Sequence, residues 1–325
     1  MTAATAAAPS PTLAERAAAL RGLGWTRRQA DWLALVCLHS GVFTRSQYQA
    51  RYDVTAGRAT RFVRALVDAG VARDAALLDR QGGRPTSVCH VHGRALYRAL
   101  GIENNRHRRR SSRELTIHRL LSLDYVLEHR DLPWLPTEPD KVAYFRRLGV
   151  PAAALPRREY RGPSSTRSTR RYFAFKLPVA GNGTATTFVF ADIGGHRRVQ
   201  RERIHAWADA HASLWQALRE RGSAVHVVAV ARTGDDAAAN AAILDSWRGE
   251  HAPAAVLSAR DQRLLAAVDR AKETGDLAPL AAYGGPIDAT TAARAIREQE
   301  RAAAGHIDAY STHVAERLAP DALAL

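Results

Sequence analysis

The stretch TRSQYQARYDVTAGRATRFVRALVDAGV, residues 44–71, predicts two short helices separated by a turn. Threonine is favoured at helix N-caps, so the helices are expected to begin after Thr44 and Thr55. The second helix has an apolar face made of Phe62, Val63, Leu66 and Val67. Its other face carries three arginines: Arg58, Arg61 and Arg64. This is the pattern of an amphipathic helix whose polar side is strongly basic.

Further helices and a hairpin flank this pair. Two helices are predicted upstream, capped by Thr12 and Thr26. Downstream, two extended segments surround QGGRP, residues 81–85, whose Gly-Gly pair signals a hairpin turn, and GRALYRALG follows as a closing helix. Helices followed by a hairpin predict a winged helix-turn-helix domain over residues 12–103.

The DNA-binding form of this domain inserts the second helix of the turn motif into the major groove. Arginine can grip guanine or phosphate through two parallel hydrogen bonds, which suits the basic helix face to that role. A winged helix that contacts proteins instead is the alternative. The candidate DNA contacts are Thr44, Arg45, Thr55, Arg58, Thr60, Arg61 and Arg64, with Arg84 at the tip of the wing.

The charge distribution also favours a polyanionic partner. The chain has 325 residues and a net charge of +15. Residues 1–115 hold 19 arginines and no lysine against 8 acidic residues, whereas residues 116–325 hold 28 basic against 24 acidic residues. A basic domain joined to a nearly neutral one is typical of nucleic-acid binding. An arginine-rich genome composition would explain the choice of arginine over lysine, but not the excess of basic over acidic residues.

Residues 104–113 form a basic junction that is expected to be a linker. Its closely spaced arginines repel one another and favour a solvated segment, which is compatible with a strap laid across DNA phosphates. The candidate strap residues are Arg106, Arg108, Arg109 and Arg110. Residues 1–11 are expected to be a disordered tail.

Residues 114–235 predict a small α/β domain. A core helix opens it, followed by an irregular stretch over residues 132–171. Strands are expected in RYFAFKLPV and TTFVFADIGG, then a long helix, then the buried strand AVHVVAVA. This order is that of a restriction-endonuclease-like core. The apolar stripe of the opening helix is Ile117, Leu120, Leu123 and Leu127, and one face of the first strand is Phe173, Phe175, Leu177 and Val179.

Residues 236–325 are expected to be mainly helical, with TTAARAIREQERAAAGHIDAYSTHVAERL as a long terminal helix or a helical pair. The predicted fold class of the whole chain is therefore α+β: a winged helix, an endonuclease-like α/β domain and a helical C-terminal region.

A nuclease of this fold would hold Mg²⁺ with acidic residues at strand ends and use a nearby lysine. Asp192 ends the strand TFVFAD, Lys176 lies on the neighbouring strand, and Gly194 stands where an acid-x-Lys pattern would place lysine. Asp192 could instead cap the helix that starts near His196. Further acids in the preceding stretch could complete a site: Glu138, Asp140 and Glu159.

Two segments in particular carry a resemblance to a known family: SVCHVHGRALYRALG at the end of the winged helix, and the helix IHRLLSLDYVLEH. With the short α/β domain after them, the chain resembles the replication-relaxation family of plasmids and integrative elements over roughly residues 25–230. That family is similar to the MobC-type relaxases, which join a winged helix to a nicking domain. The resemblance implies acidic residues and a lysine in the second domain. Asp192 matches one acid, but no acid precedes Lys176 in the matching position.

The predicted function is binding of double-stranded DNA by a mobile-element protein, with the second domain as an inactive platform that needs no cofactor. The alternatives are a Mg²⁺-dependent nickase that uses Asp192 and Lys176, and a component that contacts other proteins of a nucleoprotein assembly. The two cysteines, Cys37 and Cys89, form no C-x-x-C pair and predict a reducing cytoplasm. Neither a secretory signal nor an apolar run long enough for a bilayer is expected, so no membrane partner is predicted.

Overall fold

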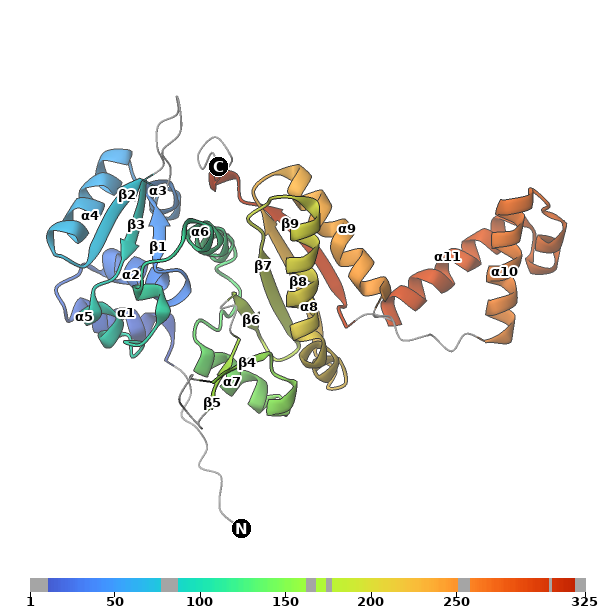
Figure 1. Ribbon diagram of the computed structural model, residues 1–325, viewed down its shortest axis with the longest axis horizontal. Helices are drawn as coiled ribbons and strands as arrows, with labels where there is room; N and C mark the ends of the chain where they lie inside the picture. The colour runs from blue at the N-terminus through green and yellow to red at the C-terminus, as the bar shows by residue number, and fades with distance from the viewer. Residues whose placement is uncertain are drawn as a thin grey trace, which may run out of the picture.

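A computed structural model describes residues 11–76, 87–161, 168–173, 177–250, 258–303 and 306–318. The chain is mixed α+β, with helices packed against small sheets (Figure 1). An N-terminal unit, a larger α/β unit and a helical arm follow one another across the molecule. Within the described ranges, the helices are all too short or too polar to cross a membrane.

The N-terminal unit contains the helices and hairpin strands that the sequence predicts. Its three strands form one antiparallel sheet in the order β1-β3-β2. The three-residue strand β1 was not predicted, because so short a segment shows no alternation. The elements are α1 (Leu13–Arg21), α2 (Arg27–His39), β1 (Val42–Thr44), α3 (Arg45–Tyr52), α4 (Ala56–Asp68), β2 (Ala72–Ala76), β3 (Ser87–Val91) and α5 (Arg94–Ala99).

Threonine caps explain where the helices of this unit begin. Thr12, Thr26 and Thr44 each accept a hydrogen bond from the backbone three residues ahead, and a Glu or Gln side chain returns the bond. Thr55 holds the same position before α4, but no side-chain hydrogen bond caps that helix in the described structure.

Aromatic packing fixes α4 on the core of the N-terminal unit. Phe62 of α4 stacks on Tyr48 with ring centroids 4.6 Å apart, and Tyr48 meets the edge of the fully buried Trp32 at 5.2 Å. Such ring pairs add to the hydrophobic gain of burial. The apolar face of α4 is thereby locked inward, and its arginine face is turned to solvent.

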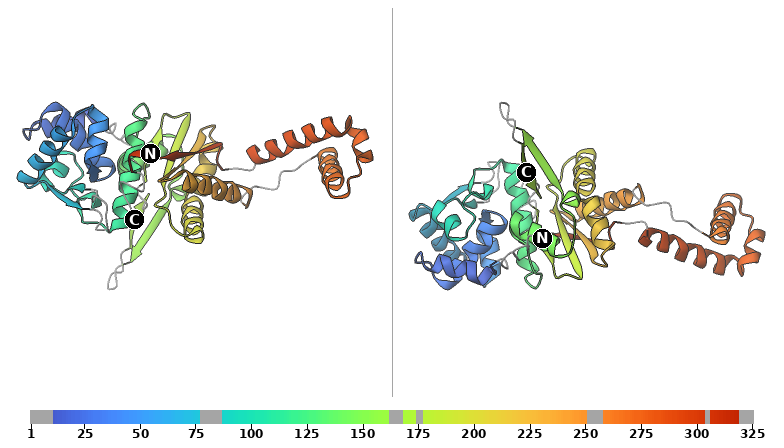
Figure 2. Two further views of the ribbon diagram at one scale, coloured as in Figure 1. Left: turned by 90° about the horizontal axis from the view of Figure 1, so that it is seen from above. Right: turned by 90° about the horizontal axis from the view of Figure 1, so that it is seen from below.

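The α/β unit is built on a sheet of order β6-β7-β8-β9. Strand β6 is antiparallel to β7, whereas β7, β8 and β9 run parallel. Helix α6 covers one face of this sheet, and α8 and α9 cover the other (Figures 1 and 2). The elements are α6 (Arg113–Glu128), α7 (Glu138–Arg147), β4 (Arg157–Arg161), β5 (Ser168–Tyr172), β6 (Val179–Gly181), β7 (Ala185–Ala191), α8 (Arg197–Arg219), β8 (Ala224–Ala231), α9 (Gly234–Glu250) and β9 (Ala309–Val314).

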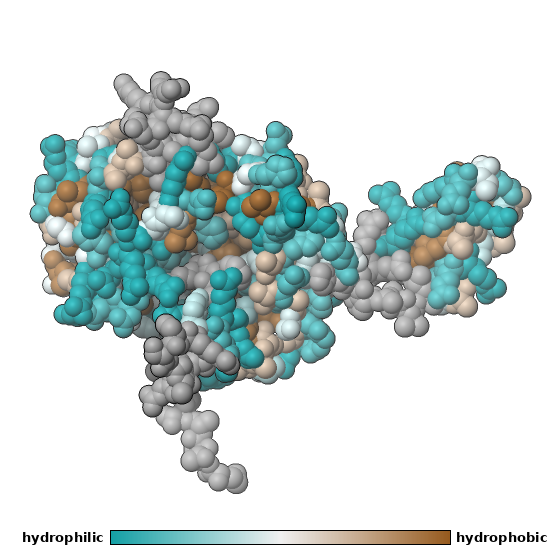
Figure 3. All heavy atoms as spheres, viewed as in Figure 1, coloured by the Kyte–Doolittle hydropathy of each residue, from teal (hydrophilic) through white to brown (hydrophobic). Residues whose placement is uncertain are grey.

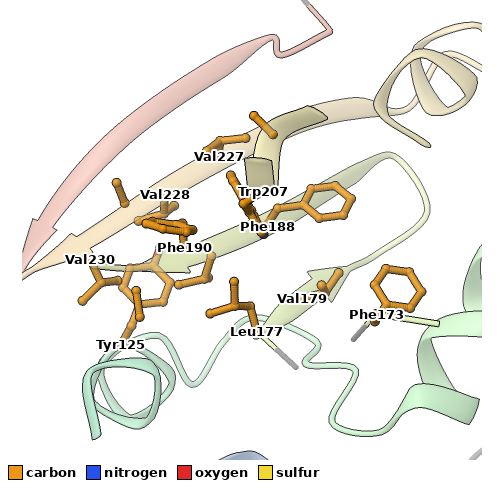
Figure 4. Packing of buried hydrophobic residues seen from close by; sticks show 14 of the residues in the cluster. Tyr125, Phe173, Leu177, Val179, Phe188, Phe190, Trp207, Val227, Val228 and Val230 are labelled. Atoms are coloured by element: carbon orange, nitrogen blue, oxygen red, sulfur yellow. The ribbon is translucent and has the colours of Figure 1, made fainter. Parts of the chain in front are cut away.

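Side chains from both faces of the sheet form a continuous apolar core (Figure 4). Phe190 of β7 lies 5.2 Å from the ring of Trp207 on α8, and Phe188 lies 5.7 Å from Trp215. Tyr125 of α6 approaches from the opposite side. The strands predicted in TTFVFADIGG and AVHVVAVA are confirmed, as is the long helix between them.

Residues 132–171 are not irregular as predicted. They contain α7 and, in the described part, the pair β4–β5. A capping box of Thr137 and Asp140 starts α7. The helix was not predicted because proline lies in its first turn, and β4 and β5 were not predicted because they are short and polar. The strand predicted over RYFAFKLPV is interrupted, because Phe173 has φ of 48° and Val179 starts the separate strand β6. Phe175 and Lys176 fall outside the described residues.

The C-terminal region contains the helices α9, α10 and α11, but the predicted long terminal helix or helical pair is corrected in its second half. Helix α11 (Pro286–Ala303) is followed by strand β9, which pairs in parallel with β8 from His226↔Ala309 to Ala231↔Val314. The mixed composition of AYSTHV hid this edge strand, because only one of its flanks is covered by another strand. Helices α10 (Ala259–Thr274) and α11 form an arm that stands away from the sheet and has its own small core (Figure 2).

Helix α6 joins the N-terminal and α/β units because its central part, between Thr116 and Leu127, is buried in both. Ile117 and Leu120 belong to the core of the α/β unit, whereas Leu123 and Leu127 belong to that of the N-terminal unit. The buried Gln47 of α3 donates to the backbone oxygen of Leu120 at 3.0 Å. A second link is a buried ion pair between Arg16 and Asp140, with a distance of 2.9 Å.

We expect Leu120→Ala to lower the free energy of unfolding by about 2–5 kcal/mol, because it opens a cavity in a fully buried site. Leu115→Ala on the same helix should change it by less than about 0.5 kcal/mol, since Leu115 is 42% exposed. Urea unfolding followed by circular dichroism measures both. Equal effects of the two substitutions would contradict the role given to α6.

Candidate nucleic-acid interface

Helix α4 presents an exposed face that carries three arginines. Arg58, Arg61 and Arg64 are all exposed, and in the described part of the chain their guanidinium groups have no carboxylate or hydrogen-bond partner. Thr60 is exposed beside them. The helix lies on the side of the N-terminal unit away from α6, and hydrophilic residues gather over much of this unit in the view of Figure 3. The second unit therefore leaves this surface open.

The N-terminus of α4 has features that favour the approach of an anion. Thr55 keeps its hydroxyl free of the capping bond, and no acidic residue occupies the first turn. A side chain added at Gly57 would meet no described atom within 4 Å, so a backbone or phosphate can approach closely there. The unpaired amides at a helix start, together with the helix dipole, attract negative groups.

Two predicted contacts are not available to DNA in this structure. Thr44 is buried, and its hydroxyl caps α3 while it also pairs with the Ser46 hydroxyl at 2.8 Å. The Arg45 guanidinium forms an ion pair with Asp74 of β2. Burial removes the Thr44 hydroxyl from the surface, and the ion pair with Asp74 neutralises the charge that Arg45 would offer to DNA. Within the N-terminal unit, the candidate contacts that remain exposed in the described residues are therefore those of α4 and its N-cap, and Arg84 lies outside the described residues.

The basic junction is ordered rather than a solvated linker. His107 is buried in a short 3-10 helix, and its backbone oxygen lies 3.0 Å from His90 Nε2 of β3. Burial lowers the pKa of His90, which favours a neutral ring at this contact. Arg108 donates to the backbone oxygen of Glu103 at 3.0 Å and is committed to the fold. The exposed arginines of the junction are Arg106, Arg109, Arg110 and Arg113.

Asp192 is a buried anchor for helix α8. Its Oδ1 accepts a hydrogen bond from Arg203 at 3.1 Å, and its Oδ2 accepts one from Gln200. The predicted capping role is corrected, because the N-cap of α8 is His196, whose ring accepts from the Arg198 amide. Both carboxylate oxygens of Asp192 thus bind side chains within α8. The position of Lys176 relative to this residue lies outside the described structure.

The other acids considered for a metal site with Asp192 have partners elsewhere. Asp140 pairs with Arg16 and caps α7. Glu138 accepts a hydrogen bond from the Tyr172 amide, and Glu159 pairs with Arg170 on the adjoining strand. Each carboxylate has a local structural partner, so these residues are not gathered at the end of β7.

One acidic group was missed at the level of sequence. Asp124, Glu128 and His313 place potential ligand atoms within 4.8 Å of one another. The i, i+4 spacing of the two acids on α6 was visible in the sequence, but His313 could be added only after β9 was known. Comparison with protein-family models, curated proteins and solved structures found no match to this chain.

We expect Asp192→Ala to destabilise the protein by about 1–3 kcal/mol, because it leaves the hydrogen-bonding groups of Gln200 and Arg203 without their acceptor. Asp245→Ala on the exposed surface of α9 serves as a matched control and should cost less than about 0.5 kcal/mol. Thermal unfolding measures the two losses.

The same pair of variants tests for catalysis. Nicking of supercoiled DNA by the wild type with Mg²⁺, lost in Asp192→Ala but kept in Asp245→Ala, would make Asp192 catalytic and overturn the anchoring role.

Proposed function

We propose that this protein binds double-stranded DNA through a winged helix formed by residues 12–103, with α4 as the recognition helix. The observation that carries the proposal is the row of exposed, unpaired arginines on α4: Arg58, Arg61 and Arg64. The helix-turn-helix order and the adjoining hairpin strands support it, since the second helix of such a motif is the one that reads DNA.

The rigidity of α4 supports a role in recognition. Phe62, Val63 and Leu66 anchor it in the core, so the arginines start from a helix rather than a loop. Contacts made from a preorganised element lose less conformational entropy on binding. Phosphate contacts from Thr55 and the first amides of α4 would set the register of the helix in the groove.

We infer that the α/β unit is a platform and not a nuclease. Its buried carboxylate at the end of β7 is saturated by Arg203 and Gln200, and the acids near α7 and β4 pair locally. The resemblance to the replication-relaxation family supports a place among the DNA-binding proteins of plasmids or other mobile elements. Cys37 and Cys89 are both buried free thiols, as suits a reducing cytoplasm.

The arm supports protein contact as an additional role. Ile287 is 81% exposed on α11, and Leu277, between α10 and α11, is 52% exposed. Large apolar side chains placed at the end of a projecting element favour contact with another protein. This role is compatible with DNA binding because α4 lies at the opposite end of the molecule (Figure 1).

The main test replaces Arg58 and Arg61 together with alanine. Duplexes are first selected from a random-sequence library with the wild type, and affinities are then measured at physiological salt. The double variant should bind at least about tenfold more weakly, since a good arginine–base pair contributes about 1–3 kcal/mol.

The control for this test is Arg260→Ala combined with Arg270→Ala. These exposed arginines lie on α10 of the arm, and their removal changes the net charge equally. The control should keep wild-type affinity. Three outcomes would show that α4 is not the recognition helix: neither variant loses affinity, both variants lose the same affinity, or the library yields no bound duplex.

A separate prediction concerns the junction. Replacing Arg106, Arg109 and Arg110 with glutamine should flatten the slope of log affinity against log salt by up to about 2.7 units, if each guanidinium neutralises one phosphate. Arg108 is left in place because it holds the backbone of Glu103. The slope is measured from the affinity for duplex DNA in titrations at salt concentrations between about 50 and 200 mM. An unchanged slope would exclude the junction from the interface.

A further inference from the structure

A group of ligand-type side chains lies between α6 and β9, in which Asp124 is buried, His313 is half-buried and Glu128 is more exposed. Asp124 and Glu128 are one turn apart on α6, and His313 projects from β9 towards them. The group is on the α6 face of the sheet, whereas the partners of Asp192 are on α8 at the other face. It is therefore a separate site from the one considered for nuclease chemistry.

Each carboxylate has one oxygen held by the protein. Asp124 Oδ1 accepts from Gln47 Nε2 at 3.1 Å and lies 3.5 Å from the Arg317 guanidinium. Glu128 Oε1 accepts from Arg317 at 2.6 Å. Asp124 has no exposed side-chain surface, and its Oδ2 has no hydrogen-bond partner in the described structure. A buried carboxylate oxygen without a donor is unusual and costly, and Arg317 lies at the other oxygen of Asp124, so Oδ2 remains without a partner in the described structure.

The imidazole of His313 faces the Glu128 carboxylate. Its Nε2 lies 3.2 Å from Glu128 Oε2 but makes no hydrogen bond within the described structure. The ring packs against Tyr125 and His129, with centroid distances of 5.1 and 5.7 Å. Three acceptor groups thus face one small volume.

We propose that Asp124, Glu128 and His313 bind one divalent transition-metal ion of the Zn²⁺ or Mn²⁺ type. Two carboxylate oxygens and an imidazole nitrogen suit such ions, whereas Mg²⁺ and Ca²⁺ prefer sets made of oxygen alone. The ion supplies the positive charge that Asp124 Oδ2 lacks. Gln47 and Arg317 hold the outer oxygens and orient the two carboxylates, as supporting residues do around metal ligands.

The metal would act as a clamp between distant parts of the chain. It connects α6 to the terminal strand directly, and through Gln47 it reaches α3, which packs against α4. Order in β9 and in the N-terminal unit would then depend on the same ion. The proposed site stands independently of DNA binding, and its failure would leave the role of α4 untouched.

The test uses the untagged full chain, stripped of metal by a chelator and then freed of the chelator. Titration with Co²⁺ should give visible d–d absorption at one equivalent, and calorimetry with Zn²⁺ should show the same stoichiometry. Bound metal should also raise the melting temperature. Asp124→Asn, Glu128→Gln and His313→Gln should each weaken binding by at least about tenfold.

His205→Gln is the matched control, because His205 and Glu250 form a similar pair at 3.8 Å that lacks a buried acid. It should bind metal like the wild type. Circular dichroism of the metal-free proteins checks folding, and Glu128→Gln stays decisive if a more buried variant does not fold, since Glu128 is 30% exposed. Absence of one-equivalent binding in the wild type, or equal binding by Glu128→Gln and His205→Gln, would overturn the proposal.

Discussion

The arrangement of this protein depends on the burial of one helix, α6, from both sides. Leu120 and Leu121 face the sheet of the α/β unit, while Leu123 and Leu127 complete the core of the N-terminal unit. A helix that two cores share cannot leave one of them without exposing apolar surface to water. Gln47 of α3 bonds to α6, so α3 faces the α/β unit and α4 lies on the opposite, solvent-exposed side of the N-terminal unit. The orientation of the basic surface is thus a consequence of hydrophobic packing on the opposite side of the same unit.

The net charge of +15 comes from two kinds of arginine, those with a carboxylate partner in the fold and those without one in the described structure. Arg16, Arg203 and Arg317 each bind a carboxylate inside the fold and contribute to stability. The arginines of α4 have no such partner in the described structure, and their charges lie on a single exposed face. The exposed arginines of α4 repel one another, and binding of a polyanion would remove this repulsion. Charge that serves folding and charge that faces a partner are therefore distinguishable by geometry.

Two buried aspartates illustrate how the same residue type acquires different roles. Asp192 is surrounded by donors from α8, so its charge is satisfied without any added group. Asp124 has Gln47 and Arg317 at one oxygen only, and its other oxygen has no donor in the described structure, while another carboxylate and an imidazole lie close by. A buried charge is stable when its hydrogen-bonding capacity is filled. That requirement makes Asp192 a structural anchor and gives Asp124 a reason to bind a cation.

Local features could be derived from the sequence alone: the threonine caps of α1, α2 and α3, the two faces of α4, and the apolar strands β7 and β8. Each of these depends on residues within one or two turns or along one strand, so periodicity reveals them. Other features became visible only in three dimensions: Ala309–Val314 joins the sheet, Thr44 and Arg45 bind partners within the fold, and His313 lies near Asp124. These features depend on pairing between segments far apart in the chain. An edge strand such as β9, which pairs with one neighbour and has a mixed composition, has no local sequence pattern from which its pairing partner can be predicted.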